Sequence, residues 1–242
     1  MADTGLPTPY YERDGITIYC GDCRDILPLL EPGSIDLVLT DPPYGVAYST
    51  GRRKNVVRSS TRLAYDLATT PLLNDTAEFI APLLNDTAHI YWFSAPKRLD
   101  VQMPIVRTMG EIVNILAWDK GNCTAGDLAA TYGQQWEAIL FARKSRVPLA
   151  GGRDRDVLRY SRGNTSAYHH PTQKPVELLS FLIGKHDNVD IVLDPFGGGG
   201  STALSALAMG KQCISIEVEE RYCAIAADRI DKQFDEGVHT HG

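Results

Sequence analysis

The chain has 242 residues, 24 of them basic and 30 acidic, so its formal net charge is −6 and its length suits one large domain or two small ones. Hydrophobic residues make up 43% and charged residues 22%, and no apolar run approaches the roughly 20 residues of a transmembrane helix, which excludes a membrane-spanning class. Residues 1–7 lack the basic and apolar regions of a secretion signal, and the five scattered cysteines do not form a disulfide framework, so we expect a cytoplasmic protein.

Apolar, β-branched runs alternate with segments of helical length along the chain. These runs predict strands over 16–19, 35–40, 89–93, 111–118, 136–143, 190–193 and 212–216. The segments between them predict helices over 23–30, 76–84, 97–109, 175–185, 201–209 and 220–234. Alternation of helices with almost wholly apolar strands predicts an α/β fold, a mostly parallel, doubly wound sheet with helices on both faces in three αβα layers.

Two segments have little periodicity and are predicted to be long loops, residues 46–66 and 145–167. Each overlaps a basic window, because residues 51–62 and residues 143–162 both carry a net charge of +5. Local basic patches are what phosphate contacts require, even in an acidic chain. A run of charge is also the ordinary signature of a solvated surface, so its meaning depends on the chemistry encoded nearby.

The heptapeptide Pro-Leu-Leu-Asn-Asp-Thr-Ala occurs twice, at 71–77 and 82–88. Two copies do not make a repeat protein. We expect a helix in this region, capped by Asn74 or Asp75 and kinked or shortened by Pro82.

A predicted strand runs into the glycine turn Asp194-Pro195-Phe196-Gly197-Gly198-Gly199-Gly200-Ser201 and then into a helix. Glycines at such a turn let the backbone approach a ligand closely. The next strand ends in Glu217, whose carboxylate can accept hydrogen bonds from both hydroxyls of a ribose. The segment therefore predicts a nucleoside-containing ligand, but a loose dinucleotide fingerprint also fits it, so the kind of nucleoside stays open.

A second strand delivers an acid to its carboxyl end in the sequence Asp41-Pro42-Pro43-Tyr44. The prolines have no N–H group, so this corner presents carbonyl and carboxylate acceptors with few competing donors. If Asp41 and the carbonyl of Pro42 accept the two hydrogens of an exocyclic amine, the lone pair of its nitrogen turns toward an electrophile. Tyr44 can stack on the base. The corner therefore predicts chemistry on a planar amine.

Taken together, these motifs resemble those of the S-adenosylmethionine-dependent DNA amino-methyltransferases that act on adenine N6 or cytosine N4. The motif at 41–44 is similar to their catalytic motif, 194–201 to their cofactor motif, and 170–175 to the segment that precedes the latter. The order resembles the β group, which implies a permuted Rossmann-like methyltransferase fold, with strand 16–19 placed beside the strand that ends in Glu217 and the two chain ends as neighbours.

The resemblance implies S-adenosylmethionine as cofactor and no metal. The implied catalytic residues are Asp41, Pro42, Pro43 and Tyr44. Among the cofactor residues, Asp22 is expected to bind the adenine amino group, Glu217 the ribose, and Lys174 the methionine carboxylate. The full cofactor set is Asp22, Thr172, Lys174, Asp194, Phe196, Gly197, Gly199, Ser201, Thr202 and Glu217.

DNA is the expected partner, and a base inside a duplex has to be flipped out to reach such a site. We expect a single catalytic domain over 1–242, with loop 45–66 as a lid and 144–168 as a target-recognition segment. The shortness of that segment favours a short recognition site, a homodimer or help from the loop at 46–66. Phosphate contacts are expected from the two loops. The basic residues proposed for these contacts are Arg52, Arg53, Lys54, Arg58, Arg62, Arg153 and Arg155.

The aspartate that opens the catalytic motif favours adenine N6 over cytosine N4 as the target, because relatives that act on cytosine more often begin this motif with serine. Several alternatives stay open. RNA or a protein amide presents the same kind of planar amine. A nicotinamide- or flavin-dependent oxidoreductase would explain the glycine turn but not the motif at 41–44. A nucleic-acid-binding module without activity would explain the basic windows alone. A restriction partner is not identified by the sequence.

Overall fold

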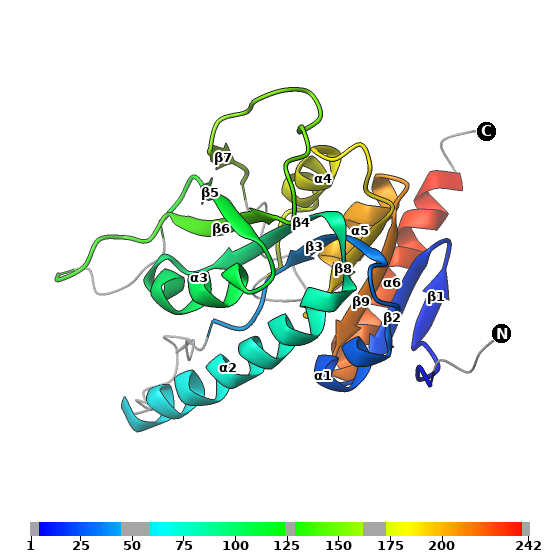
Figure 1. The fold of residues 1–242 in the computed structure, drawn as a ribbon, viewed down its shortest axis with the longest axis horizontal. Helices are drawn as coiled ribbons and strands as arrows, with labels where there is room; N and C mark the ends of the chain where they lie inside the picture. Colours follow the sequence, from blue (N-terminus) through cyan, green and yellow to red (C-terminus); the bar gives the residue numbers. More distant parts are fainter. Residues whose placement is uncertain (1–4, 45–58, 124–128, 162–172, 239–242) are drawn as a thin grey trace.

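A computed structural model describes residues 5–44, 59–123, 129–161 and 173–238, which form a nine-stranded sheet in the order β1-β2-β9-β8-β3-β4-β6-β5-β7 (Figure 1). Five of the eight pairings between neighbouring strands are parallel, which confirms the mostly parallel sheet. The strands are β1 Tyr11–Arg13, β2 Ile16–Cys20, β3 Ile35–Thr40, β4 Leu84–Ser94, β5 Glu111–Asp119, β6 Trp136–Arg143, β7 Val157–Arg159, β8 Ile191–Asp194 and β9 Gln212–Glu217.

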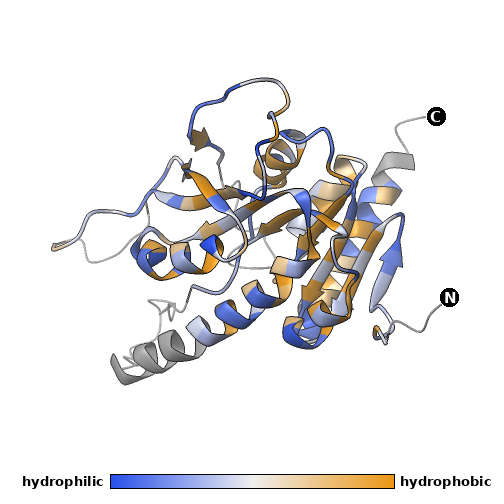
Figure 2. Cartoon of the chain, viewed as in Figure 1, coloured by the Kyte–Doolittle hydropathy of each residue, from blue (hydrophilic) through white to orange (hydrophobic). Residues whose placement is uncertain are grey.

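Helices cover both faces of this sheet. Buried side chains of α1, α2 and α3 pack on one face, and those of α4, α5 and α6 pack on the other, which confirms the three-layer arrangement. Figure 2 shows the hydrophobic residues concentrated in the central strands and in the helices beside them. No helix in the described part of the chain has the length and apolarity needed to cross a bilayer. The helices are α1 Cys23–Ile26, α2 Ser59–Ile80, α3 Leu99–Arg107, α4 Val176–Gly184, α5 Ser201–Ala208 and α6 Glu220–Val238, with 3-10 turns at Leu27–Leu29, Ala81–Leu83 and Pro96–Arg98.

The strand β3, Ile35–Thr40, shows why the three residues at its centre are all apolar. Leu37 and Leu39 are fully buried and pack toward α4, α5 and α6, whereas Val38 between them is fully buried toward α1, α2 and α3. Successive side chains of a strand point to opposite faces, so a stretch of strand that is covered on both sides favours apolar residues at consecutive positions.

The permuted connection is also confirmed. β2 pairs in parallel with β9, and β9 pairs with β8, so the strand near the start of the chain completes the half-sheet that the end of the chain begins. β1 and α6 contact each other at this edge. The hydroxyl of Tyr11 donates to Asp231 at 2.8 Å, and the guanidinium of Arg13 lies over the ring of Phe234. The first and last described elements are therefore neighbours, as expected.

Some predicted boundaries are wrong. The helix predicted over 76–84 belongs to the longer α2, which ends at Ile80, and Leu84 already begins β4. α2 begins at Ser59, inside the predicted loop 46–66, and Asn74 and Asp75 lie within it rather than capping it. Once the buried turns near Leu73 and Ile80 hold a helix on the sheet, extending it residue by residue is inexpensive.

Two short strands were not predicted. β7, Val157–Arg159, lies in the segment predicted to be a loop and pairs in parallel with β5. β1, Tyr11–Arg13, pairs antiparallel with β2. Both are three-residue strands at the two edges of the sheet, where pairing with a neighbour rather than a pattern of their own defines them.

Candidate active site

The carboxyl ends of the parallel strands β2, β3, β8 and β9 lie at one edge of the sheet and carry acidic residues. Asp194 ends β8, Glu217 ends β9, and Asp41 directly follows β3. The chain leaves β8 toward α5 on one face, whereas β3 leads on to α2 on the other. Strands whose connections part in this way open a crevice at their carboxyl ends, where α/β proteins bind ligands.

The glycine turn after β8 packs tightly against β9 and α6. A Cβ atom on Gly197 would overlap the hydroxyl oxygen of Ser215, and one on Gly200 would lie 2.7 Å from the Cβ of Ala226. Gly200 also has a φ of +76°, which a residue with a side chain rarely adopts. Only glycine therefore fits at these two positions, and the turn presents bare backbone.

Glu217 holds this turn from the neighbouring strand. Its carboxylate accepts hydrogen bonds from the backbone N–H of Gly198 at 2.9 Å and from that of Glu219 at 2.8 Å. Burial raises the pKa of Glu217, and these N–H donors oppose the rise. Each carboxylate oxygen can accept a second hydrogen bond, so Glu217 retains acceptors for hydroxyl groups.

Asp194 lies beneath the turn and is 3% exposed. One of its oxygens accepts hydrogen bonds from the hydroxyl of Thr40 at 2.8 Å and from the backbone N–H of Phe196 at 3.1 Å. Burial raises its pKa to about 6. This carboxylate joins the cofactor motif to the end of β3, where the catalytic motif begins. Ser201 and Thr202, at the start of α5, are likewise buried.

Asp22 follows β2 at the same edge of the sheet. Its carboxylate caps α1 by accepting from the backbone N–H of Arg24 at 2.9 Å, and it pairs with the guanidinium of Arg24 at 2.6 Å. The hydrogen bond from Arg24 keeps the pKa of Asp22 below its usual value. The expected contact with an adenine amino group therefore shares its acceptor with a helix cap.

The catalytic motif brings three polar groups together. The hydroxyl of Tyr44 donates to one oxygen of Asp41, and the ammonium of Lys174 pairs with the other. The side chain of Lys174 is only 5% exposed and that of Asp41 is 22% exposed. Lys174, which the resemblance places at the methionine carboxylate of a cofactor, forms an ion pair with Asp41 in the structure.

Two charged residues that the sequence analysis did not single out complete this cluster. Glu137, on β6, pairs with Lys174 at 3.3 Å and with Lys120 at 3.2 Å. The side chains of Glu137 and Lys120 are 7% and 4% exposed. A glutamate inside an otherwise apolar strand was the signal for this pair, because buried charges occur in proteins when they are paired.

Aromatic rings surround the lysine of the cluster. The ammonium of Lys174 lies 5.1 Å from the ring centre of Phe93, 5.8 Å from that of Trp118 and 5.7 Å from that of Tyr44. Burial alone would lower the pKa of Lys174, but Asp41 and Glu137 raise it, so the ammonium stays charged. Burial and the charge of Glu137 raise the pKa of Asp41, against the effect of Lys174.

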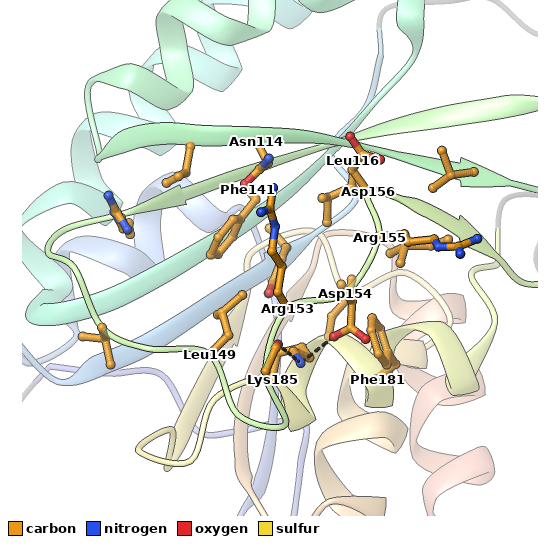
Figure 3. Close-up of a pocket in the computed structure, with 18 of the residues that line it drawn as sticks. Asn114, Leu116, Phe141, Leu149, Arg153, Asp154, Arg155, Asp156, Phe181 and Lys185 are labelled. Atoms are coloured by element: carbon orange, nitrogen blue, oxygen red, sulfur yellow. Dashed lines mark hydrogen bonds and ion pairs between the residues drawn. The ribbon is translucent and has the colours of Figure 1, made fainter.

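A groove lies between α4 and the strands β5 and β6 and has a volume of about 1010 Å³. Its floor is apolar and includes Leu116, Phe141 and Phe181, and the exposed Arg153 and Arg155 line it (Figure 3). Lys185 holds the loop over the groove through an ion pair with Asp154 and a 3.0 Å hydrogen bond to the carbonyl of Gly152. Arg153 and Arg155, two of the residues predicted to contact DNA, therefore line the same groove.

The remaining predicted site residues are not placed together with these groups. Arg52, Arg53, Lys54, Arg58 and Thr172 lie outside the described residues, as do most of the predicted lid and part of the predicted recognition segment. Arg62 lies within the helix α2 and not in a loop. In the part of the chain that the structure covers, no three His, Cys, Asp or Glu side chains are grouped to hold a metal ion.

Comparison with known proteins gives a consistent result. Residues 35–228 match a family model described as DNA methylase. The chain is 33% identical over 215 residues to YubD of Escherichia coli (strain K12), covering 87% of this chain and 88% of YubD. It is 25% identical over 263 residues to the DNA adenine methyltransferase YhdJ of the same organism, and the match covers 94% of this chain and 87% of YhdJ. The crystal structure of the M1.HpyAVI–SAM complex resembles this chain with a TM-score of 0.63 and 25% sequence identity. The match covers 88% of this chain and 99% of the chain in that structure.

Proposed function

The chain belongs to the DNA methylases that modify adenine N6 or cytosine N4, and from this membership we propose that it transfers a methyl group from S-adenosylmethionine to the N6 amine of an adenine flipped out of DNA. The observation that carries the proposal is the hydrogen bond between Thr40 and Asp194. It fixes the end of β3, and with it Asp41, beside the glycine turn. A site for the amine and a site for the methyl donor thus adjoin.

The residues at the turn fit the proposed cofactor. The turn presents backbone without side chains, because Gly197 and Gly200 pack closely against Ser215 and Ala226, and Glu217 retains acceptors for the ribose hydroxyls. Phe196, Gly197 and Gly199 are proposed to shape the methionine pocket, with Asp22 near the adenine. When bound, S-adenosylmethionine supplies an electrophilic methyl group to the amine. Ser201 and Thr202 are buried, so we propose that they support the turn through their hydroxyls.

The role proposed for Asp41 is to accept a hydrogen bond from the N–H of the target amine. An amine held in this way by Asp41 and by the carbonyl of Pro42 directs its lone pair out of the plane of the base. Tyr44 stacks on the base and orients it. Such a site accelerates the transfer by positioning the reacting atoms rather than by strong base catalysis. The amine nitrogen would form a bond to the methyl carbon as the bond from that carbon to sulfur breaks, and the proton that the nitrogen then loses would pass along its hydrogen bond to Asp41.

We propose that the basic loops hold the DNA. Arg153 and Arg155 lie exposed at the groove beside β7 and provide charges that phosphates can reach. The segment 45–66 follows the catalytic motif directly, so its basic residues are proposed to close over the flipped nucleotide. We propose a single catalytic domain, and the short segment at 144–168 supports a short recognition site, a homodimer or help from the loop at 46–66.

The test is nucleoside mass spectrometry of DNA from a methylation-free host that expresses the protein or its Asp41→Ala variant. We expect N6-methyladenine with the wild type and none with Asp41→Ala, because the variant lacks the acceptor that orients the amine. Calorimetry with S-adenosylmethionine should give dissociation constants within a few-fold of each other for the two proteins. Normal transfer by Asp41→Ala would remove Asp41 from the mechanism.

Cytosine N4 is the second candidate target, because the family includes enzymes of both kinds and both amines are planar. The aspartate at position 41 favours adenine. The same mass spectra separate the two, since N4-methylcytosine without N6-methyladenine would keep the mechanism and change the base. If cofactor binds and neither base is modified, RNA or protein becomes the substrate to test.

A further inference from the structure

Four side chains of alternating charge form a row that consists of three buried residues and the partly exposed Asp41 at its end. Asp41 contacts Lys174, Lys174 contacts Glu137 at 3.3 Å, and Glu137 contacts Lys120 at 3.2 Å. The row joins the end of β3, the segment before α4, β6 and the end of β5. With all four groups ionised its net charge is zero, which is how a protein tolerates charges in its interior.

Lys174 limits what Asp41 can do. A carboxylate accepts hydrogen bonds at both oxygens, and in the structure Tyr44 donates to one oxygen while Lys174 pairs with the other. Each oxygen can accept a second hydrogen bond, so an amine that approaches Asp41 shares the carboxylate with these two donors, and the positive charge of Lys174 weakens the attraction of Asp41 for it. Aromatic rings occupy the surroundings of the ammonium, so water does not weaken its hold on Asp41.

Glu137 is the second anion that contacts the same ammonium. Its other oxygen is held by Lys120, whose side chain is 4% exposed, so the carboxylate of Glu137 is fixed in place rather than mobile. We propose that Glu137, anchored by Lys120, is a positioning residue that shares Lys174 with Asp41 and so leaves Asp41 able to accept the target amine. This inference rests on the proposed function and assigns a role to two residues outside the catalytic motif.

Removal of the Glu137 charge gives the first test. In Glu137→Gln the ammonium of Lys174 keeps one anionic partner and is drawn fully to Asp41. We expect kcat for methyl transfer to a DNA duplex to fall about 10-fold or more, because the amine is held less well. The dissociation constant for S-adenosylmethionine should stay within about two-fold, since Glu137 does not contact the glycine turn in the structure.

The pH profile distinguishes positioning from a merely structural role. The charged or titratable groups that face Asp41 are Lys174, Tyr44, Glu137 and Asp194. Among them Glu137 contributes to raising the pKa of Asp41. Without that charge the carboxyl ionises at lower pH, so the acid limb of the kcat profile should move to lower pH in Glu137→Gln. A variant that only loosens the fold would leave this limb where it is.

Two further variants complete the experiment. Glu111→Gln is the matched control, because Glu111 forms an ion pair on the adjacent strand β5, is 69% exposed and lies outside the row; its kcat and acid limb should equal those of the wild type. The double variant Glu137→Gln/Lys120→Gln removes one charge of each sign and keeps the interior neutral. It should fold even if Glu137→Gln does not, and it should show the same loss of kcat and the same shift of the acid limb.

The outcomes are separable. If the wild type is active and the double variant keeps either its kcat or its acid limb unchanged, the inference is overturned and the proposed function stays intact. A wild type that transfers no methyl group to DNA overturns both. Reduced kcat together with a lower acid limb, and an unaffected Glu111→Gln, supports the role of Glu137.

Discussion

Asp194 is a carboxylate whose acidity is set almost entirely by its surroundings. It is 3% exposed, and burial raises its pKa from 3.8 to about 6, against the effect of hydrogen bonds from Thr202, Thr40 and Phe196. The unfolded chain loses this proton near pH 4, whereas the folded protein keeps it until about pH 6. The folded state therefore binds more protons in this window, and its stability falls as the pH rises through it.

Asp194→Asn is expected to remove this pH dependence, because asparagine keeps an oxygen acceptor for Thr40 and carries no charge. The free energy of unfolding of the wild type, relative to the variant, should fall by up to about 3 kcal/mol between pH 4 and pH 6. Urea denaturation at several pH values measures it. Asp231→Asn is the control of opposite sign, because hydrogen bonds from Tyr11 and Arg13 lower the pKa of Asp231. A parallel pH dependence in wild type and Asp194→Asn would contradict the assignment.

The glycine turn shows how one element depends on its neighbour. Gly197 does not have a positive φ, so any residue could adopt its backbone angles, and what excludes a side chain is the hydroxyl of Ser215 on β9. Gly197→Ala should therefore destabilise the protein by about 1–3 kcal/mol and weaken the binding of S-adenosylmethionine, because the overpacked turn has to move.

Ser215→Ala provides a matched suppressor for Gly197→Ala. It removes the hydroxyl oxygen that the methyl group of the alanine would overlap, and the next nearest atoms are 3.4 Å away. Thermal unfolding and calorimetry on both single variants and the double variant measure the recovery. The double variant should regain most of the stability and affinity lost in Gly197→Ala. No recovery would mean that backbone freedom at Gly197, rather than the contact with Ser215, is what the turn needs.

The two copies of the repeated heptapeptide adopt different secondary structures. Residues 71–77 form part of α2, whereas the identical residues 82–88 form a 3-10 turn and the start of β4. In the second copy Leu84 pairs with Ile35 of β3, and Asn85 donates to Asp36. The same side chains thus adopt a helix or a strand according to what lies beside them. Local sequence could not separate the two copies, which is why the helix predicted over 76–84 was wrong.

At the scale of the whole molecule, charge is distributed unevenly along an acidic chain. Arg153 and Arg155 lie beside β7 at one edge of the sheet, and β1 forms the other edge. The logarithm of the association constant for duplex binding falls as the logarithm of the salt concentration rises. Replacing both arginines by glutamine should make this negative slope shallower by about 2, because each phosphate contact releases about one counterion.

The matched control is Arg13→Gln/Arg221→Gln. It removes two basic side chains from β1 and α6, which contact the opposite end of the sheet, and it should leave the slope unchanged. Fluorescence anisotropy with a labelled duplex at several salt concentrations measures the slopes. Equal slopes for wild type and the Arg153/Arg155 variant would exclude the groove from the DNA interface.

The sequence by itself determined the α/β fold class and the two motifs that follow parallel strands at the same end of the sheet, whereas the resemblance to a methyltransferase family implied the permuted order of the strands. The sequence determined the class and the motifs because apolar strands, a glycine turn and a proline corner are local patterns whose physical meaning does not depend on distant residues. Asp41, Asp194 and Glu217 could be predicted as neighbours on this basis alone, since parallel strands end at a common edge.

The tertiary structure alone decided which charges meet inside the protein. Lys174, which was predicted to contact the methionine carboxylate of the cofactor, lies between Asp41 and Glu137, and Lys120 pairs with Glu137. Asp41, Glu137 and Lys174 are far apart in the chain and come from different elements, whereas Lys120 follows β5 and meets Glu137 across the β5–β6 pair. A buried charge takes the partner that packing brings within a few ångströms, and that choice follows from the arrangement of the sheet rather than from spacing along the sequence.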